Sequence, residues 1–165
     1  MTDQWKTATW SQFGAAIAML ENAIQGCPEA LWGDRSHKPE FWYVAFHTLF
    51  FLDLYLSESE VGFRPPVPFT LDEMDERGLM PERVYTKQEL LRYLEHGRIK
   101  CRETIAGMTD ERAGRRCGFS WLEISGEEAL LYNMRHVQHH AGQLHLILRQ
   151  RTDAAPRWVR AAKPI

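Results

Sequence analysis

The sequence lacks the features that mark membrane, secreted or nucleic-acid-binding proteins. No stretch reaches the roughly 20 apolar residues that cross a bilayer, and the longest apolar run, residues 41–52, contains His47 and Thr48. The N-terminus has no basic start followed by an apolar run, so it does not predict a secretory signal. Lysine and arginine total 20 against 22 acidic residues, a net charge of −2 that argues against a protein gripping nucleic acid through its phosphates. We therefore expect neither a membrane nor a nucleic acid as partner.

Cysteine is also scarce. The three cysteines are widely spaced and form no C-x-x-C pair: Cys27, Cys101 and Cys117. An odd number at such spacings fits reduced thiols in a cytosol better than a disulfide framework. We interpret them as small apolar residues of the core and expect a cytoplasmic protein.

What the sequence does contain is typical of one globular domain. Its 165 residues are 44% apolar and 25% charged, enough for one sizeable core and too few for two ordinary domains. No internal repeat or low-complexity linker divides the chain. We therefore expect a single domain over residues 1–165.

Helical periodicity dominates four segments, at about residues 9–25, 39–57, 86–106 and 125–150. Thr86 with Glu89, and Ser125 with Glu128, have the spacing of capping boxes at helix starts. Between the second and third segments lies a long connection, residues 58–85, which holds four prolines and has room for a short helix at 71–77. These features predict an all-α fold, an antiparallel four-helix bundle with a long crossover loop between the second and third helices.

Seven histidines are present, and two of them have a spacing that suits a metal. His136 and His140 lie four residues apart, so in a helix their imidazoles stand one turn apart on one face. The same spacing occurs in the H-E-x-x-H helix of zinc proteases, although no nearby glutamate takes the position of the protease base. Imidazole ligands suit zinc, nickel, copper or iron.

His47 is the candidate for a third ligand. It lies midway along the second segment among aromatic residues, where burial without a partner costs about 1–3 kcal/mol. A core histidine bonded to a carbonyl or a tyrosine is one interpretation of this residue. With a two-histidine helix in the same small protein, we favour a metal site of His47, His136 and His140. The alternative, that all three are ordinary bundle residues and no metal binds, stays open here.

Two polar residues flank the histidine pair in the last segment. Asn133 lies one turn before His136, where it either touches a metal-bound ligand or bonds across the bundle. Gln143 lies on the other flank, where its amide is placed to orient His140 or His139.

The same segment resembles a family signature. The H-x-x-x-H-x-G-Q pattern of His136, His140, Gly142 and Gln143 looks like the fourth-helix motif of the DinB/YfiT-like superfamily, and a histidine inside the second helix, His47, extends the resemblance. It implies a divalent metal held by His47, His136 and His140, nickel or zinc first and iron or manganese as alternatives, in a homodimer. Characterised relatives include thiol-S-transferases and isomerases that use low-molecular-weight thiols.

Two functions are compatible with three histidines on a metal. Such a site lowers the pKa of a bound water to about 7, or holds a substrate thiol as thiolate. The first function is thus a metal-dependent thiol transferase or hydrolase in stress or detoxification, and the resemblance favours thiol transfer from a low-molecular-weight thiol. The second is a non-catalytic metal- or ligand-binding dimer of a stress response.

Surface features point to self-association. Leu131 and Leu146 face away from the core stripe of the last segment, and the second segment is apolar almost all round. A homodimer is the simplest account of such faces. The alternative is that the proline-rich connection and the tail that contains Trp158 cover them.

One local charge cluster stands out against the neutral balance. Arg112, Arg115 and Arg116 lie close together just before the last helical segment. We interpret this cluster as a solvated loop.

Overall fold

The computed structural model describes the whole chain except residues 37, 154–155 and 164–165. Seven helical elements are assigned in the described residues: α1 (Asp3–Gly26), α2 (Glu29–Trp32), α3 (Phe41–Tyr55), the 3₁₀ helix η1 (Asp72–Met74), α4 (Lys87–Ala106), α5 (Asp110–Gly114) and α6 (Gly126–Thr152). The described part of the chain contains no β-strand, and an isolated antiparallel bridge joins Arg116 to Ser125. The all-α prediction is confirmed.

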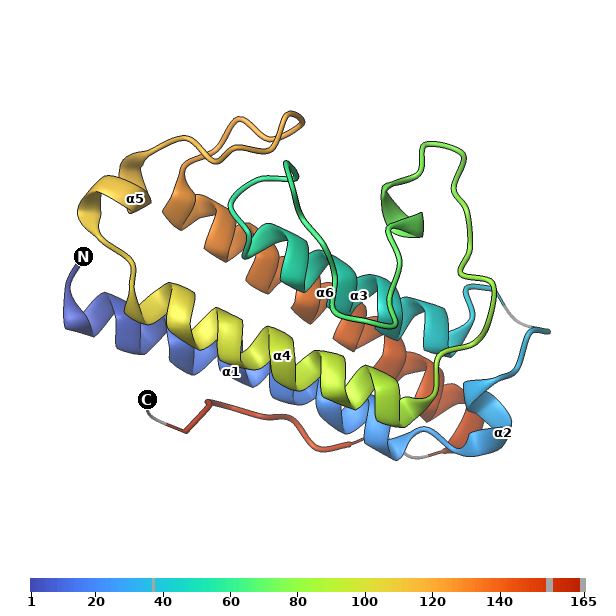
Figure 1. The fold of residues 1–165 in the computed structure, drawn as a ribbon. Helices are drawn as coiled ribbons and strands as arrows, with labels where there is room; N and C mark the ends of the chain where they lie inside the picture. Colours follow the sequence, from blue (N-terminus) through green and yellow to red (C-terminus); the bar gives the residue numbers. More distant parts are fainter. Residues whose placement is uncertain (37, 154–155, 164–165) are drawn as a thin grey trace.

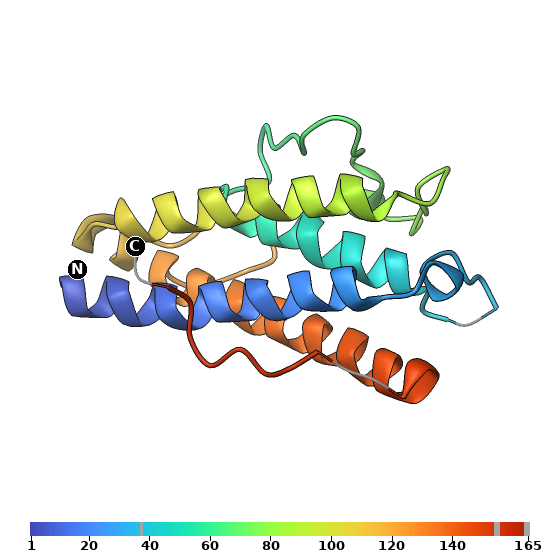
Figure 2. The same cartoon turned by 90° about the horizontal axis from the view of Figure 1, so that it is seen from below.

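The four long helices lie side by side (Figures 1 and 2). α1 packs against α4 and α6, and α3 packs against the same two helices. In Figure 1, α1 and α6 run from left to right, whereas α3 and α4 run from right to left. α3 and α4 run in the same direction because the segment between them, residues 56–86, returns along the molecule before α4 begins.

Two helix starts lie where the capping signals predict them. At the start of α4, the Thr86 hydroxyl accepts a hydrogen bond from the Glu89 backbone N–H at 3.2 Å, and the Thr86 N–H donates to the Glu89 carboxylate at 2.8 Å. At the start of α6, the Ser125 hydroxyl accepts from the Glu128 N–H at 3.3 Å. Both caps satisfy donors that a helix N-terminus leaves without partners inside the helix.

Two other starts differ from the sequence prediction. α1 begins at Asp3 rather than near residue 9, because the Thr2 hydroxyl caps it by accepting from the Trp5 N–H at 3.2 Å. α3 begins at Phe41 rather than at Pro39. Glu40 is in an extended conformation, and its buried carboxylate accepts a hydrogen bond from the Trp42 indole at 2.6 Å. The short helices α2 and α5 were not predicted, because four or five residues are too few to show a helical pattern of apolar positions.

The long connection between α3 and α4 is held to the bundle by aromatic side chains. Phe69 stacks on Tyr93 of α4 with ring centroids 4.4 Å apart, and Phe63 meets Phe50 of α3 edge-on at 5.4 Å. Phe63, Phe69 and Tyr85 are all buried, so each contributes a large apolar surface to the core. These anchors fix the path of the connection, and with it the position of η1 over α3.

The C-terminal tail runs back along α1 (Figure 2). The Trp10 indole donates to the carbonyl of Lys163 at 2.9 Å, and the Ala162 N–H donates to the Ser11 carbonyl at 2.9 Å. Among the described residues, no helix combines the length and the apolar character needed to span a bilayer.

Candidate metal centre

The three histidines singled out in the sequence meet between α3 and α6. His47, His136 and His140 each offer one ring nitrogen to a cluster in which these atoms lie within 4.8 Å of one another. The Nε2 atoms of His47 and His136 are 3.4 Å apart. Two nitrogens bound to one tetrahedral ion at 2.0–2.1 Å are separated by about 3.3 Å, so the observed spacing fits a shared metal.

A carboxylate from the long connection holds His47 in place. Nδ1 of His47 lies 2.6 Å from Oε2 of Glu73, a residue of η1. The Glu73 side chain is only 3% exposed. Because Nδ1 donates to this carboxylate, Nε2 is left as the lone-pair atom that faces His136. Metal-binding histidines characteristically have such a carboxylate partner, which sets the tautomer and raises the basicity of the ligand.

His140 is oriented in the same way by a different partner. Its Nδ1 lies 2.7 Å from the side-chain oxygen of Gln143, one of the two roles that the sequence suggested for that residue. Nε2 of His140 is therefore also left free to face the other histidines. The sequence prediction that Gln143 orients a histidine is confirmed.

Unsatisfied buried atoms gather at this site. Nδ1 of His136 and Oε1 of Glu73 are both buried without a hydrogen-bond partner among the described residues. No lysine or arginine of the described residues forms an ion pair with Glu73, whose ion-pair partner is His47. The Tyr43 side chain also lies beside this buried carboxylate, and a cation held on the far side of the His47 imidazole would offset its negative charge. The donor set of three histidines beside a buried carboxylate thus fits a bound divalent metal.

The electrostatics keep the ring nitrogens available. Burial, and after it the nearby His140 and His47, lowers the pKa of His136 to about 3. Burial also lowers the pKa of His140, against an opposing contribution from its hydrogen bond to Gln143. Both imidazoles are therefore neutral at pH 7, which is the form that binds a metal.

A hollow in the surface gives access to the cluster. Its volume is about 320 Å³, and it is lined by Tyr132, Arg135, His136 and His139. His136 is thus both a member of the cluster and part of the wall of this hollow. Arg135 lies over the ring of Tyr132 at 5.5 Å, beside the opening. A small molecule in this hollow would contact His136, one member of the cluster.

The remaining polar candidates lie outside the cluster. Asn133 is fully buried and donates to the Leu52 carbonyl at 3.0 Å, so it bonds across the bundle. His145 is buried and contacts the Met19 carbonyl at 2.9 Å through Nε2. The cysteines are free and buried, as interpreted from the sequence, and burial raises the pKa of Cys27 to about 12. None of these residues belongs to the cluster.

Glu73 is the site residue that the sequence did not reveal, and it provides a direct test. Replacing Glu73 by glutamine is expected to weaken Zn²⁺ binding about 10- to 100-fold, the usual effect of losing such an outer partner. Competition with a chromophoric chelator measures this affinity. Glu76→Gln, in the same connection but with an exposed side chain, is the matched control. Equal affinities for the two variants would show that the Glu73 contact does not support the site.

Comparison with known proteins yields a family and no individual relative. Residues 12–144 match the family model described as the DinB superfamily. The match covers most of the chain and includes all three histidines and Glu73. No curated protein and no solved structure match the chain.

Proposed function

The chain belongs to the DinB superfamily, and on that premise we propose that it is a metal-dependent enzyme which transfers a low-molecular-weight thiol to an electrophile. His47, His136 and His140 are the proposed metal ligands, with nickel or zinc as the first candidates and iron or manganese as alternatives. The single observation that carries the proposal is the convergence of three imidazoles from two helices, with His47 and His140 each oriented through Nδ1.

Three neutral ligands suit this chemistry better than a charged ligand set would. Imidazoles leave the full positive charge of a divalent ion in place, and a bound ion of this kind stabilises a thiolate, the reactive form of a thiol. In the reaction, the thiol sulfur forms a bond to an electrophilic carbon, the leaving group departs with its electron pair, and the thiol proton passes to solvent. The same donor set suits hydrolysis by an activated water, and the family resemblance favours thiol transfer.

The protein's own residues divide the work of binding and orientation. Glu73 and Gln143 fix the rings of His47 and His140. The hollow beside His136 is the proposed place of the substrates, and Arg135 on its wall suits a thiol that carries a carboxylate. Phe51 and Tyr55 cover the other side of His136, with ring centroids at 5.6 and 6.1 Å, and limit the approach of water there.

The proposal is tested by thiol consumption with a generic electrophile. Metal-loaded protein is incubated with glutathione, cysteine, bacillithiol or mycothiol and 1-chloro-2,4-dinitrobenzene, and release of chloride and loss of thiol are followed. The wild-type protein is expected to exceed the His47→Ala variant, while His96→Ala, an exposed histidine of α4 outside the cluster and the hollow, retains activity. Equal rates for wild type and His47→Ala across the thiols would refute the thiol-transferase proposal.

A second candidate function is a non-catalytic metal- or ligand-binding dimer of a stress response. The same three histidines support it, and it differs only in lacking turnover. Metal bound at one ion per chain, together with no thiol consumption above the variant, is the result that favours it.

We also propose that the protein is a homodimer. Leu131 and Trp158 are exposed beside an apolar hollow of about 690 Å³ between α1, α6 and the tail, so the tail leaves this face uncovered. Leu131→Glu is expected to shift the protein from dimer to monomer in light scattering, because it places a charge on the apolar face. Val61→Glu, exposed on the connection between α3 and α4 and outside the hollow, is the control. A wild-type protein that is monomeric at all concentrations would contradict the proposal.

The remaining expectations complete the proposed setting. We take the chain to act as a single cytoplasmic domain in stress or detoxification, with no nucleic-acid or membrane partner. The packing of α1 and α3 against α4 and α6 supports a four-helix bundle with a crossover loop of residues 56–86. Only the pairs α1 with α4 and α3 with α6 are antiparallel, because α1 runs in the same direction as α6 and α3 in the same direction as α4 (Figure 1).

A further inference from the structure

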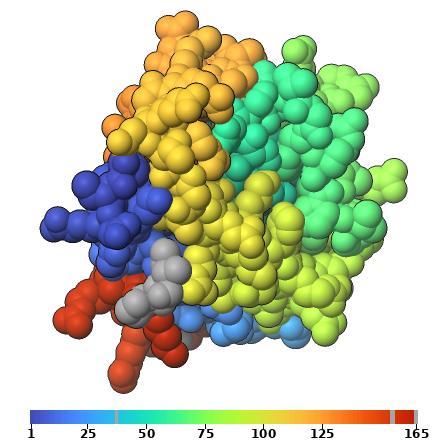
Figure 3. Space-filling model, turned by 60° about the vertical axis from the view of Figure 1, so that its left-hand side comes forward, coloured from blue at the N-terminus to red at the C-terminus, as the bar shows by residue number. Residues whose placement is uncertain are grey.

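A second pocket lies at the end of the bundle where α3 finishes and α6 begins. Its volume is about 310 Å³, and its walls come from the chain just after α3, from α5 and from the start of α6. Figure 3 faces this end, where the segment that follows α4 meets the segment that follows α3 at the surface. The two are joined by a hydrogen bond of 2.7 Å from the Gly118 N–H to the Glu58 carbonyl.

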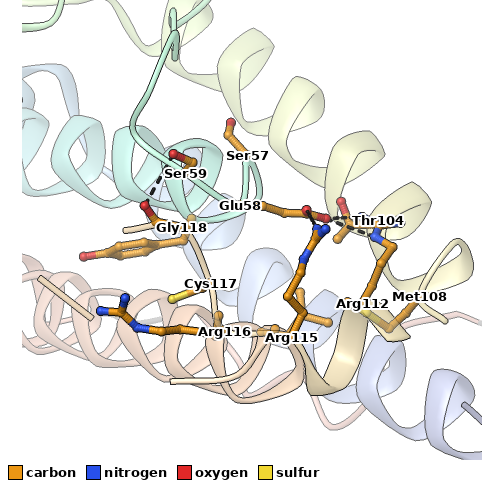
Figure 4. A pocket seen from close by; sticks show the side chains of 14 residues that line it. Ser57, Glu58, Ser59, Thr104, Met108, Arg112, Arg115, Arg116, Cys117 and Gly118 are labelled. Atoms are coloured by element: carbon orange, nitrogen blue, oxygen red, sulfur yellow. Dashed lines mark hydrogen bonds and ion pairs between the residues drawn. The ribbon is translucent and has the colours of Figure 1, made fainter. Parts of the chain in front are cut away.

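The arginine cluster seen in the sequence lines this pocket. Arg112, Arg115 and Arg116 all contribute to the wall. Arg115 and Arg116 are exposed, as expected of a solvated loop, and the loop also lines a cavity. Figure 4 shows Arg112 and Arg115 turned toward Glu58, whereas Arg116 points the other way. Sequence periodicity could not show this, because the three residues converge only when the segments after α3 and α4 meet.

Glu58 shows which kind of group these guanidinium groups bind. Its carboxylate receives hydrogen bonds from Nε of Arg112 at 3.1 Å, from Nη2 of Arg112, and from Nη2 of Arg115 at 3.2 Å. A third nitrogen group of Arg112 is taken up by the Gly107 carbonyl at 3.0 Å. Arg112 is thus fully engaged, whereas Arg115 keeps donors for a second anion.

The charge inside the pocket is not balanced by its own residues. The lining residues include three arginines and one carboxylate, that of Glu58, a surplus of two positive charges. Arg116 has only a distant ion-pair partner, Glu123 at 3.8 Å, whose side chain is 89% exposed. Such an exposed pair stabilises little. The N-terminal end of α6, a helix of 27 residues, borders the pocket at Gly126 and adds its positive dipole end.

Neutral hydrogen-bonding groups complete the lining. The hydroxyl side chains of Ser57, Ser59 and Thr104 line the cavity. The backbone at Gly118 and Gly126 packs tightly behind the cavity. A Cβ at Gly118 would lie 2.9 Å from the Ser59 side chain, and a Cβ at Gly126 would lie 2.3 Å from the Arg112 carbonyl oxygen. The serine hydroxyls already donate to the carbonyls of Asp53 and Gly118, so the donors left for an anion are the guanidinium groups.

We propose that this pocket is a binding site for a small organic or inorganic polyanion, bound through its carboxylate or phosphate groups by Arg115 and Arg116. Guanidinium groups match both chemistries with paired N–H donors. The site is separate from the histidine cluster. Ala129 in its wall precedes His136 by seven residues on the same face of α6, about 10 Å along the helix.

The test is calorimetric titration of the purified protein with inorganic phosphate and, separately, with succinate, in a chloride buffer of constant ionic strength. Arg115→Gln/Arg116→Gln is expected to weaken binding by at least about tenfold, because it removes charge-assisted hydrogen bonds. Arg149→Gln, an exposed arginine near the other end of α6, is the matched control. His136→Ala/His140→Ala is expected to bind as wild type, which separates this site from a metal-bound anion.

Comparing the two ligands shows whether the pocket prefers a phosphate group or a carboxylate group. Tighter binding of phosphate points to a phosphorylated ligand, and tighter binding of succinate points to a carboxylate ligand; both support the site. Binding of neither ligand up to about tenfold above ordinary metabolite concentrations, in the millimolar range, would overturn the proposal. So would a loss in the double variant no larger than the loss in Arg149→Gln.

Discussion

Replacing His136 by alanine is expected to weaken Zn²⁺ or Ni²⁺ binding by more than about 100-fold. Losing an outer partner of a ligand already costs up to that factor, and His136 would be a ligand itself. It supplies one of the three ring nitrogens and lies 3.4 Å from the Nε2 atom of His47. Competition titration against a chelator of known affinity measures the loss.

His139→Ala is the control for this variant. His139 lies on the same helix, its side chain is exposed, and it stands outside the cluster of three. It is expected to leave the affinity within about twofold, since a surface substitution of this kind has little effect. If His136→Ala bound metal as tightly as His139→Ala, the cluster would not be the metal site.

The second large effect is expected on stability rather than on metal binding. Asp53 of α3 is 1% exposed, and its carboxylate is bonded to Lys100 at 2.5 Å and to the Tyr93 hydroxyl at 3.1 Å. Asp53→Ala is expected to lower the free energy of unfolding by about 3 kcal/mol, because it removes the counter-charge of Lys100 and leaves the buried Tyr93 hydroxyl without its acceptor. Urea denaturation measures the loss. The m value, the slope of the unfolding free energy against urea concentration, is expected to be the same for the variant and the wild-type protein.

The stability experiment is performed with a chelator present in every sample, so that metal binding does not contribute. Glu95→Ala is the control, because Glu95 forms an ion pair with Arg98 on the exposed side of α4. Its expected loss is below about 0.5 kcal/mol. A loss for Asp53→Ala as small as that for Glu95→Ala would mean that the buried pair does not hold α3 against α4.

The histidine pair was predictable because its geometry depends on one helix alone. A spacing of four residues places His136 and His140 on one face whatever the rest of the chain does. His47 needed a second inference, that an imidazole in an aromatic helix requires a partner, and the structure brings all three together. Capping signals likewise located the starts of α4 and α6, since the Thr86 and Ser125 hydroxyls bond to backbone atoms three residues away.

Glu73 could not be predicted in the same way. It lies in a connection whose path is set by Phe63 and Phe69 packing on distant helices, and no periodicity records such a path. The requirement of a bound histidine for an outer carboxylate was a signal that some acidic residue belongs there, without saying which. The pocket lined by Arg112 and its neighbours could not be predicted either, because it forms only when two separate segments meet.

The most direct test of the account is elemental analysis of untagged protein purified without metal-affinity resin, beside the His136→Ala/His140→Ala variant. The account predicts about one transition-metal ion per chain in the wild-type protein, and its loss in the variant while the helical circular dichroism stays the same. No metal in either protein, and none taken up on titration with nickel or zinc, would contradict the central claim that these histidines form a metal site.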